Sequence, residues 1–145
     1  MLFDYFRNGV LNNLLQGTAF TFPSNLYFAL LTRWPDPDAT GSTITEPSAG
    51  NGYVRQQLNP STINYSAAAA GPAGSAGVSW NNTAIQFPTP TGSWNTVVGV
   101  ALVDASSGGN AYYAGLSSLG LIGVGSPPPT FPVGDIVFEL GSRDP

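Results

Sequence analysis

The longest uninterrupted apolar run in the chain spans residues 97–103 and reads VVGVALV. Because β-branched valine favours an extended backbone, the run is typical of a strand rather than a helix. Apolar residues at consecutive positions indicate a strand that is buried on both faces. The run is also much shorter than the roughly 20 apolar residues that a membrane-spanning helix needs. We therefore predict a central strand here and no membrane partner.

Turn-forming residues fill positions 104–110, and a second apolar segment follows at 111–116. Two apolar segments joined by a glycine-containing turn predict a β-hairpin. In segment 53–58, Val54 and Leu58 alternate with Arg55 and Gln57, so we expect the first two to face a core. Further short strands are expected at 26–32, at 82–87, at 117–125 with a bulge at Gly120 or Gly123, and at 136–140.

No helices alternate with these strands, so a parallel sheet is not expected. The 145 residues suit one domain. The fold class is therefore mainly β: an antiparallel β-sandwich of about seven or eight strands, with one N-terminal amphipathic helix, in a single domain over residues 1–145.

That helix is predicted at residues 2–16, where apolar residues recur at helical spacing and Gly17 is placed to end it. The apolar positions are Phe3, Phe6, Val10, Leu11 and Leu14. Two interpretations stay open. The apolar face could cover the open side of the chain's own sheet, or it could dock onto a partner chain.

Two segments show no regular pattern: a long loop at 34–52 and an Ala/Gly-rich arm at 60–77. Loops of this length inside a compact domain are usually functional or mobile. We expect an extended or flexible arm that is either disordered or ordered only against a neighbouring chain. The candidate protein–protein interface residues are Trp34, Asp36, Asp38 and Tyr65, and the alternative is that they are ordinary exposed loop residues.

The chain is poor in chemically active side chains. It has no Lys, His or Cys, and charged residues make up 8% of it. The usual triads, thiol nucleophiles, Schiff-base lysines and zinc ligands are therefore missing. With four arginines and a net charge of −4, it has no basic patch for nucleic acid. So few charges favour a chain packed in an assembly, and a homo-oligomer is expected. Asp4 and Arg7 interrupt the N-terminal apolar residues, which argues against a signal peptide.

The carboxylates suggest no active site. Asp36 and Asp38 form the closest pair, but Ca²⁺ needs six to eight oxygen ligands, so we expect no metal and no cofactor. No carboxylate has a visible partner that would shift its pKa, so an enzyme is not expected. Aromatic residues could instead form a sugar-binding platform, although packing in a core is the simpler interpretation. These residues are Trp34, Trp80, Trp94, Tyr112 and Tyr113.

Several blocks follow one another in an order that resembles a known family. They are GTAF at 17–20, LYFALLT at 26–32, GYVRQ at 52–56, NTAIQFPT at 82–89, the stretch 94–104, SGGN at 107–110 and the stretch 131–135. Their order and spacing are similar to those of small tailed-bacteriophage virion proteins that are described as tail-fibre-like or minor tail proteins.

The resemblance implies a non-enzymatic, tail-associated subunit of the virion, made in the cytoplasm of the host bacterium. Its partners would be other virion proteins, either tail or major capsid subunits. Two alternatives stay open. One is a cement or decoration protein that stabilises the capsid, and the other is a carbohydrate-binding module that recognises the host surface.

Overall fold

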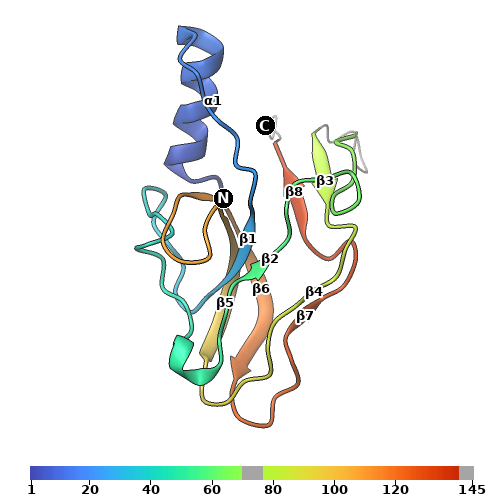
Figure 1. The fold of residues 1–145 in the computed structure, drawn as a ribbon. Coiled ribbons are helices and arrows are strands. Elements are labelled where there is room, and N and C mark those ends of the chain that lie inside the picture. Colours follow the sequence, from blue (N-terminus) through green and yellow to red (C-terminus); the bar gives the residue numbers. More distant parts are fainter. Residues whose placement is uncertain (70–76, 141–145) are drawn as a thin grey trace, which may run out of the picture. The chain divides into compact units, whose positions relative to one another are not determined.

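The computed structural model describes residues 1–69 and 77–140. In this part the chain is mainly β, with one α-helix and eight strands that pair antiparallel (Figure 1). The predicted fold class is thereby confirmed, although the sheets do not close. The elements are α1 (Asp4–Gln16), β1 (Tyr27–Leu31), the 3₁₀ turn η1 (Ala49–Asn51), β2 (Gln56–Gln57), β3 (Val78–Trp80), β4 (Ile85–Gln86), β5 (Asn95–Val103), β6 (Ala111–Ile122), β7 (Thr130–Phe131) and β8 (Val137–Glu139).

The chain divides into two compact units. Unit 1 contains Met1–Asn59 and Phe87–Pro129, and unit 2 contains Pro60–Gln86 and Thr130–Pro145. The single domain over residues 1–145 stays a prediction. The predicted arm at 60–77 belongs to unit 2, but its positions 70–76 lie outside the described residues.

Unit 1 contains a four-stranded antiparallel sheet in the order β2-β1-β5-β6. The predicted hairpin is confirmed, because β5 and β6 are neighbours joined by the turn at 104–110. The second strand is longer than expected and includes the weak segment after residue 116. Gly120 has a φ of 69°, and the pairing shifts register between Val97 and Gly99, so the predicted irregularity at Gly120 is also found.

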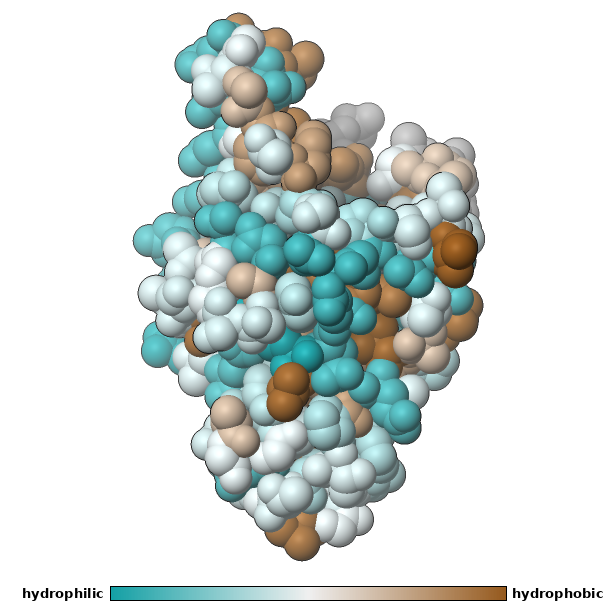
Figure 2. Space-filling view, in the orientation of Figure 1, coloured by the Kyte–Doolittle hydropathy of each residue, from teal (hydrophilic) through white to brown (hydrophobic). Residues whose placement is uncertain are grey.

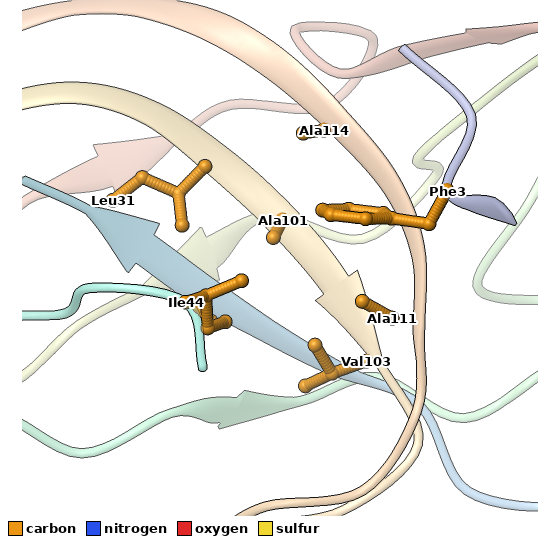
Figure 3. Close-up of a cluster of buried hydrophobic side chains, with 8 residues drawn as sticks. Phe3, Leu31, Ile44, Ala101, Val103, Ala111 and Ala114 are labelled. Atoms are coloured by element: carbon orange, nitrogen blue, oxygen red, sulfur yellow. The ribbon is translucent and has the colours of Figure 1, made fainter. Parts of the chain in front are cut away.

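A buried cluster on this sheet holds both the N-terminal segment and the long loop (Figure 3). Phe3 lies against small residues of the β5–β6 hairpin, Ala101, Ala111 and Ala114, which leave space for its ring. Ile44 reaches the same cluster from the long loop and is buried. The loop is therefore anchored by an apolar side chain of its own, as close packing in a core requires.

A second group of buried aromatic rings lies in unit 1. The indole of Trp94 is fully buried, and its ring centroid is 5.4 Å from that of Tyr53 in an edge-on arrangement. The Nε1–H of Trp94 donates to the carbonyl of Asn51 at 2.7 Å. Tyr53 also stacks on Phe87 at 6.1 Å. Trp94 is thus a packing residue with a satisfied polar atom, and it does not contribute to an exposed sugar platform.

Unit 2 has two two-stranded antiparallel sheets, β3-β8 and β4-β7. Its central polar residue is Asn81, which is completely buried. The side-chain Nδ2 of Asn81 donates to the carbonyls of Thr83 and Pro132 at 3.0 and 2.9 Å, and its Oδ1 accepts from the backbone N–H of Ile136 at 2.9 Å. One amide side chain therefore joins the two parts of the sequence that build this unit.

Candidate functional site

The long loop at 34–52 is held in place by a buried arginine. Within residues 1–69 and 77–140, Arg55 and Asn81 are the buried polar or charged residues. The Nε and Nη2 of Arg55 donate to both carboxylate oxygens of Glu46, at 2.6 to 3.2 Å. Its Nη2 also donates to the carbonyl of Gly41 at 2.7 Å. Arg55 therefore clamps the loop at two separate points.

The same guanidinium also holds the turn between β5 and β6. The Nη1 of Arg55 donates to the carbonyls of Ala105 and Gly108 at 2.7 and 2.8 Å. All five N–H donors of the guanidinium are thereby used, so Arg55 has none left for an anionic ligand. The expected alternation was wrong here, because Arg55 is buried while Val54 is exposed. Arg55 can be buried because its charge is paired and its donors are satisfied.

Close backbone contact joins the long loop to the hairpin turn. The N–H of Gly41 donates to the carbonyl of Gly109 at 2.9 Å. A Cβ atom at position 41 would collide with the carbonyl oxygen of Gly108, so only glycine fits there. On the turn itself, Asp104 accepts from the N–H and Nδ2 of Asn110 and from the hydroxyl of Tyr112, at 2.7, 2.8 and 3.1 Å. Asp104 thus stabilises the predicted turn at 104–110 from its first position.

Buried and half-buried tyrosines make the stability of the fold fall at alkaline pH. Burial raises the pKa of Tyr113 to about 12. Burial, reinforced by the carboxylate of Glu46, also raises the pKa of Tyr53, whose hydroxyl donates to Glu46 Oε1 at 2.7 Å. A tyrosine with a raised pKa keeps its proton in the folded protein after the unfolded chain has lost it. The stabilisation that comes from the raised pKa is therefore complete below pH 10 and is lost as pH rises further.

We therefore expect the free energy of unfolding to fall steadily between about pH 10 and pH 12. Side chains should contribute little change between about pH 7 and pH 9, since the chain has no His, Cys or Lys. Urea unfolding measured across this range checks the prediction, and Tyr53→Phe should reduce the alkaline slope. Stability that stays constant up to about pH 12 would contradict it.

Three of the four predicted interface residues lie around one pocket. A cavity of about 330 Å³ is lined by Arg33, Trp34, Pro35, Asp36, Asp38, Ala39, Thr40, Thr43, Ile44 and Thr45. Pro35 and Ile44 are buried, whereas the three predicted residues Trp34, Asp36 and Asp38 are exposed. The structure therefore brings these three residues together. Their role in a protein interface stays a prediction.

The fourth predicted residue, Tyr65, belongs to unit 2. Its ring is 6.1 Å from that of Phe138 in an edge-on arrangement, and burial raises the pKa of its hydroxyl. Tyr65 also forms an isolated antiparallel bridge with Asn81. Tyr65 is half-buried and packs within unit 2, and its role in a protein interface stays a prediction.

Helix α1 presents most of its apolar side chains to solvent. Phe6 is buried, but exposure rises along the helix, to 52% for Leu11, 74% for Leu14 and 75% for Leu15. Apolar residues are visible at the far end of α1 in Figure 2. The first interpretation, that the apolar face covers the chain's own sheet, therefore holds for Phe3 and Phe6 but not for the later turns. Leu15 was not among the predicted apolar positions, but it falls beside Leu11 and Leu14 on the helix.

Two glycines shape α1 and the chain that follows it. Gly17 ends the helix in a left-handed conformation with φ 66°, as predicted. Phe20, on the segment that follows, lies so close to Gly9 that a Cβ atom at position 9 would collide with its ring. The glycine inside the helix thus has a packing role, because it lets the following segment return along α1.

Among residues 1–69 and 77–140, no group of three or more Asp, Glu, His or Cys side chains is placed to hold a metal ion. In the same part of the chain, α1 is neither long nor apolar enough to cross a membrane.

Comparison with known proteins gives one family. Residues 2–139 match the family model described as podophage GP4 fiber I protein gp80. No curated protein sequence matches the chain. The family match covers nearly the whole length and agrees with the resemblance that the ordered sequence blocks predicted. The chain therefore belongs to this family of phage fibre proteins and is a tail-fibre-like structural protein.

Proposed function

We propose that this protein is a non-enzymatic subunit of the tail fibre, and that copies of it join through the exposed face of α1. We call this surface the α1 face, and it consists of Leu11, Leu14 and Leu15. One observation carries the proposal: these three leucines are more than half exposed in a helix whose base packs against β6 through Phe6. Large side chains gathered at such exposure on one surface mark an interaction site.

The charge distribution favours a second copy as the partner. Residues 8–32 contain no charged side chain, although the chain as a whole carries a net charge of −4. Two copies that meet along this segment therefore bring no like charges together. Asn8, Asn12 and Gln16 fall four residues apart on the helix. Amide side chains both donate and accept hydrogen bonds, so an identical row on a second copy can satisfy them.

Two of the carboxylates support a non-enzymatic role. Glu46 is occupied by Arg55 and Tyr53, and Asp104 is occupied by Asn110 and Tyr112. The hydrogen bonds of these two carboxylates stabilise the fold, which supports a structural role for both residues.

The position of the protein in the particle tests the fibre role. We expect cryo-electron microscopy of purified virions to show it at the tail, in a small number of copies. Many copies spread over the head surface would instead show the alternative role, a decoration protein that stabilises the capsid. Absence of the chain from purified virions would overturn both roles.

A carbohydrate-binding role is a second candidate. The pocket beside Trp34 favours it, because it joins an exposed aromatic ring and two carboxylates in one place.

A further inference from the structure

We propose that the pocket beside Trp34 binds a single residue of a neutral carbohydrate. Its volume of about 330 Å³ lies at the small end of the range for ligand sites. A cavity of this size suits one sugar ring rather than a long segment of a chain. The inference gives the second candidate function a defined site and ligand class, and it uses a surface that is separate from the α1 face.

The aromatic side of the pocket is held in place by the sheet. Trp34 is 40% exposed. A Cβ atom added to Gly99 would lie 3.2 Å from Cζ3 of Trp34, so the indole edge rests against the backbone of β5. Trp34 thus combines a supported edge with an exposed surface. The apolar C–H face of a sugar ring can pack on an indole surface, which aromatic residues at binding sites commonly provide.

The polar side of the pocket has unused hydrogen-bonding capacity. Within residues 1–69 and 77–140, no hydrogen bond or ion pair engages the charged groups of Arg33, Asp36 and Asp38. A carboxylate can accept two hydroxyl donors, and a guanidinium can donate to a ring or hydroxyl oxygen. These groups match the hydroxyl edge of a sugar, while Trp34 matches its apolar face.

The net charge of the pocket favours a neutral sugar over an acidic one. Two carboxylates and one guanidinium give the pocket a net charge of −2 + 1 = −1. A uronic or sialic acid would add another carboxylate to a pocket whose net charge is already negative, and like charges repel. A neutral sugar brings hydroxyl donors without that repulsion.

The backbone around the pocket is fixed before any ligand arrives. The carbonyl of Asp36 accepts from the N–H of Ala39 at 3.0 Å, and the carbonyl of Pro37 accepts from the N–H of Asp4 at 2.8 Å. Arg55 holds the carbonyl of Gly41 a few residues later. A site ordered in advance spends less of its binding free energy on loop ordering, which matters for a ligand as small as one sugar.

A ligand-observed NMR titration of the whole chain tests the inference. The probes are galactose, glucose, N-acetylglucosamine and rhamnose, with galacturonic acid as the charged counterpart of galactose. We expect at least one neutral sugar to bind with a roughly millimolar Kd, and galacturonic acid to bind at least about tenfold more weakly than galactose.

Matched variants locate the site. Trp34→Ala should weaken binding at least about tenfold, whereas Trp34→Phe should keep most of it because a ring remains. Trp80 is exposed to almost the same extent, at 37%, but does not line the pocket, so Trp80→Ala should leave binding unchanged. Asp36→Asn combined with Asp38→Asn should weaken binding, while Asp135→Asn should not. Circular dichroism checks that each variant is folded.

Three results would overturn the inference: no binding by any neutral probe, unchanged binding in folded Trp34→Ala, or tighter binding of galacturonic acid than of galactose. The test is independent of the assembly role. A variant with Leu14→Lys and Leu15→Lys should bind the same sugar, since these residues do not line the pocket.

Discussion

Replacing Arg55 by methionine should lower the free energy of unfolding by about 3–5 kcal/mol. The methionine side chain fills a similar space but leaves the carboxylate of Glu46 largely buried and without its cation. It also removes the donors to the carbonyls of Gly41, Ala105 and Gly108. Each buried acceptor left without a donor adds to the loss. Urea or thermal unfolding followed by circular dichroism measures this change.

The second ion pair of the described residues provides the control. Arg7 and Asp4 pair on the surface of α1, with side chains that are 48% and 42% exposed. Arg7→Met should therefore change stability by less than about 1 kcal/mol. If Arg55→Met and Arg7→Met cost the same, Arg55 would not be the residue that holds the loop and the turn together.

Replacing Leu14 and Leu15 by lysine should separate the assembled copies into single chains. Burial of a leucine contributes about 1.5–3 kcal/mol, so two lost leucines weaken the contact by at least about 3 kcal/mol, or more than a hundredfold in Kd. Lysine suits a helix, and a cation is favoured near a helix C-terminus, so α1 should stay folded. Size-exclusion chromatography with light scattering measures the number of copies.

Two exposed leucines elsewhere in unit 1 make a matched control. Leu116 and Leu121 on β6 are 83% and 76% exposed, as exposed as Leu14 and Leu15. Leu116→Lys with Leu121→Lys introduces the same charge, so the copies should stay together. A wild-type chain that is a single copy at every concentration tested would contradict self-association through α1.

The β5–β6 hairpin shows what local pattern can predict. The apolar run at 97–103 and the turn formers at 104–110 lie next to each other in the sequence, so neighbouring residues contain the whole signal. The C-terminal cap at Gly17 was predictable for the same reason, since a left-handed residue just beyond a helix favours glycine.

The environment of Arg55 could not be predicted from the local sequence pattern. The alternation along residues 53–58 placed Arg55 on the solvent side of the strand. That placement also agrees with the high cost of burying an isolated guanidinium. The carbonyls that satisfy it belong to residues 14, 50 and 53 positions away. No local pattern contains that information, and only the folded chain brings the partners together.

The candidate site residues also differ in how well the local sequence predicted their location. Trp34, Asp36 and Asp38 are close in sequence, and they share one pocket. Tyr65 was grouped with them only because it also lies in an irregular segment, and it packs against Phe138 in the other unit. For α1, helical spacing identified an apolar face but could not say what covers it. The structure shows that its own sheet covers only the first turn.

The account depends most on the α1 face as the surface through which the protein assembles. The most direct measurement is the amount of this chain in purified virions that carry the variant with Leu14→Lys and Leu15→Lys, compared with virions that carry Leu116→Lys and Leu121→Lys. We predict that the α1 variant is lost from the particles while the β6 variant stays at the wild-type level. Equal, wild-type amounts of both variants would contradict the account.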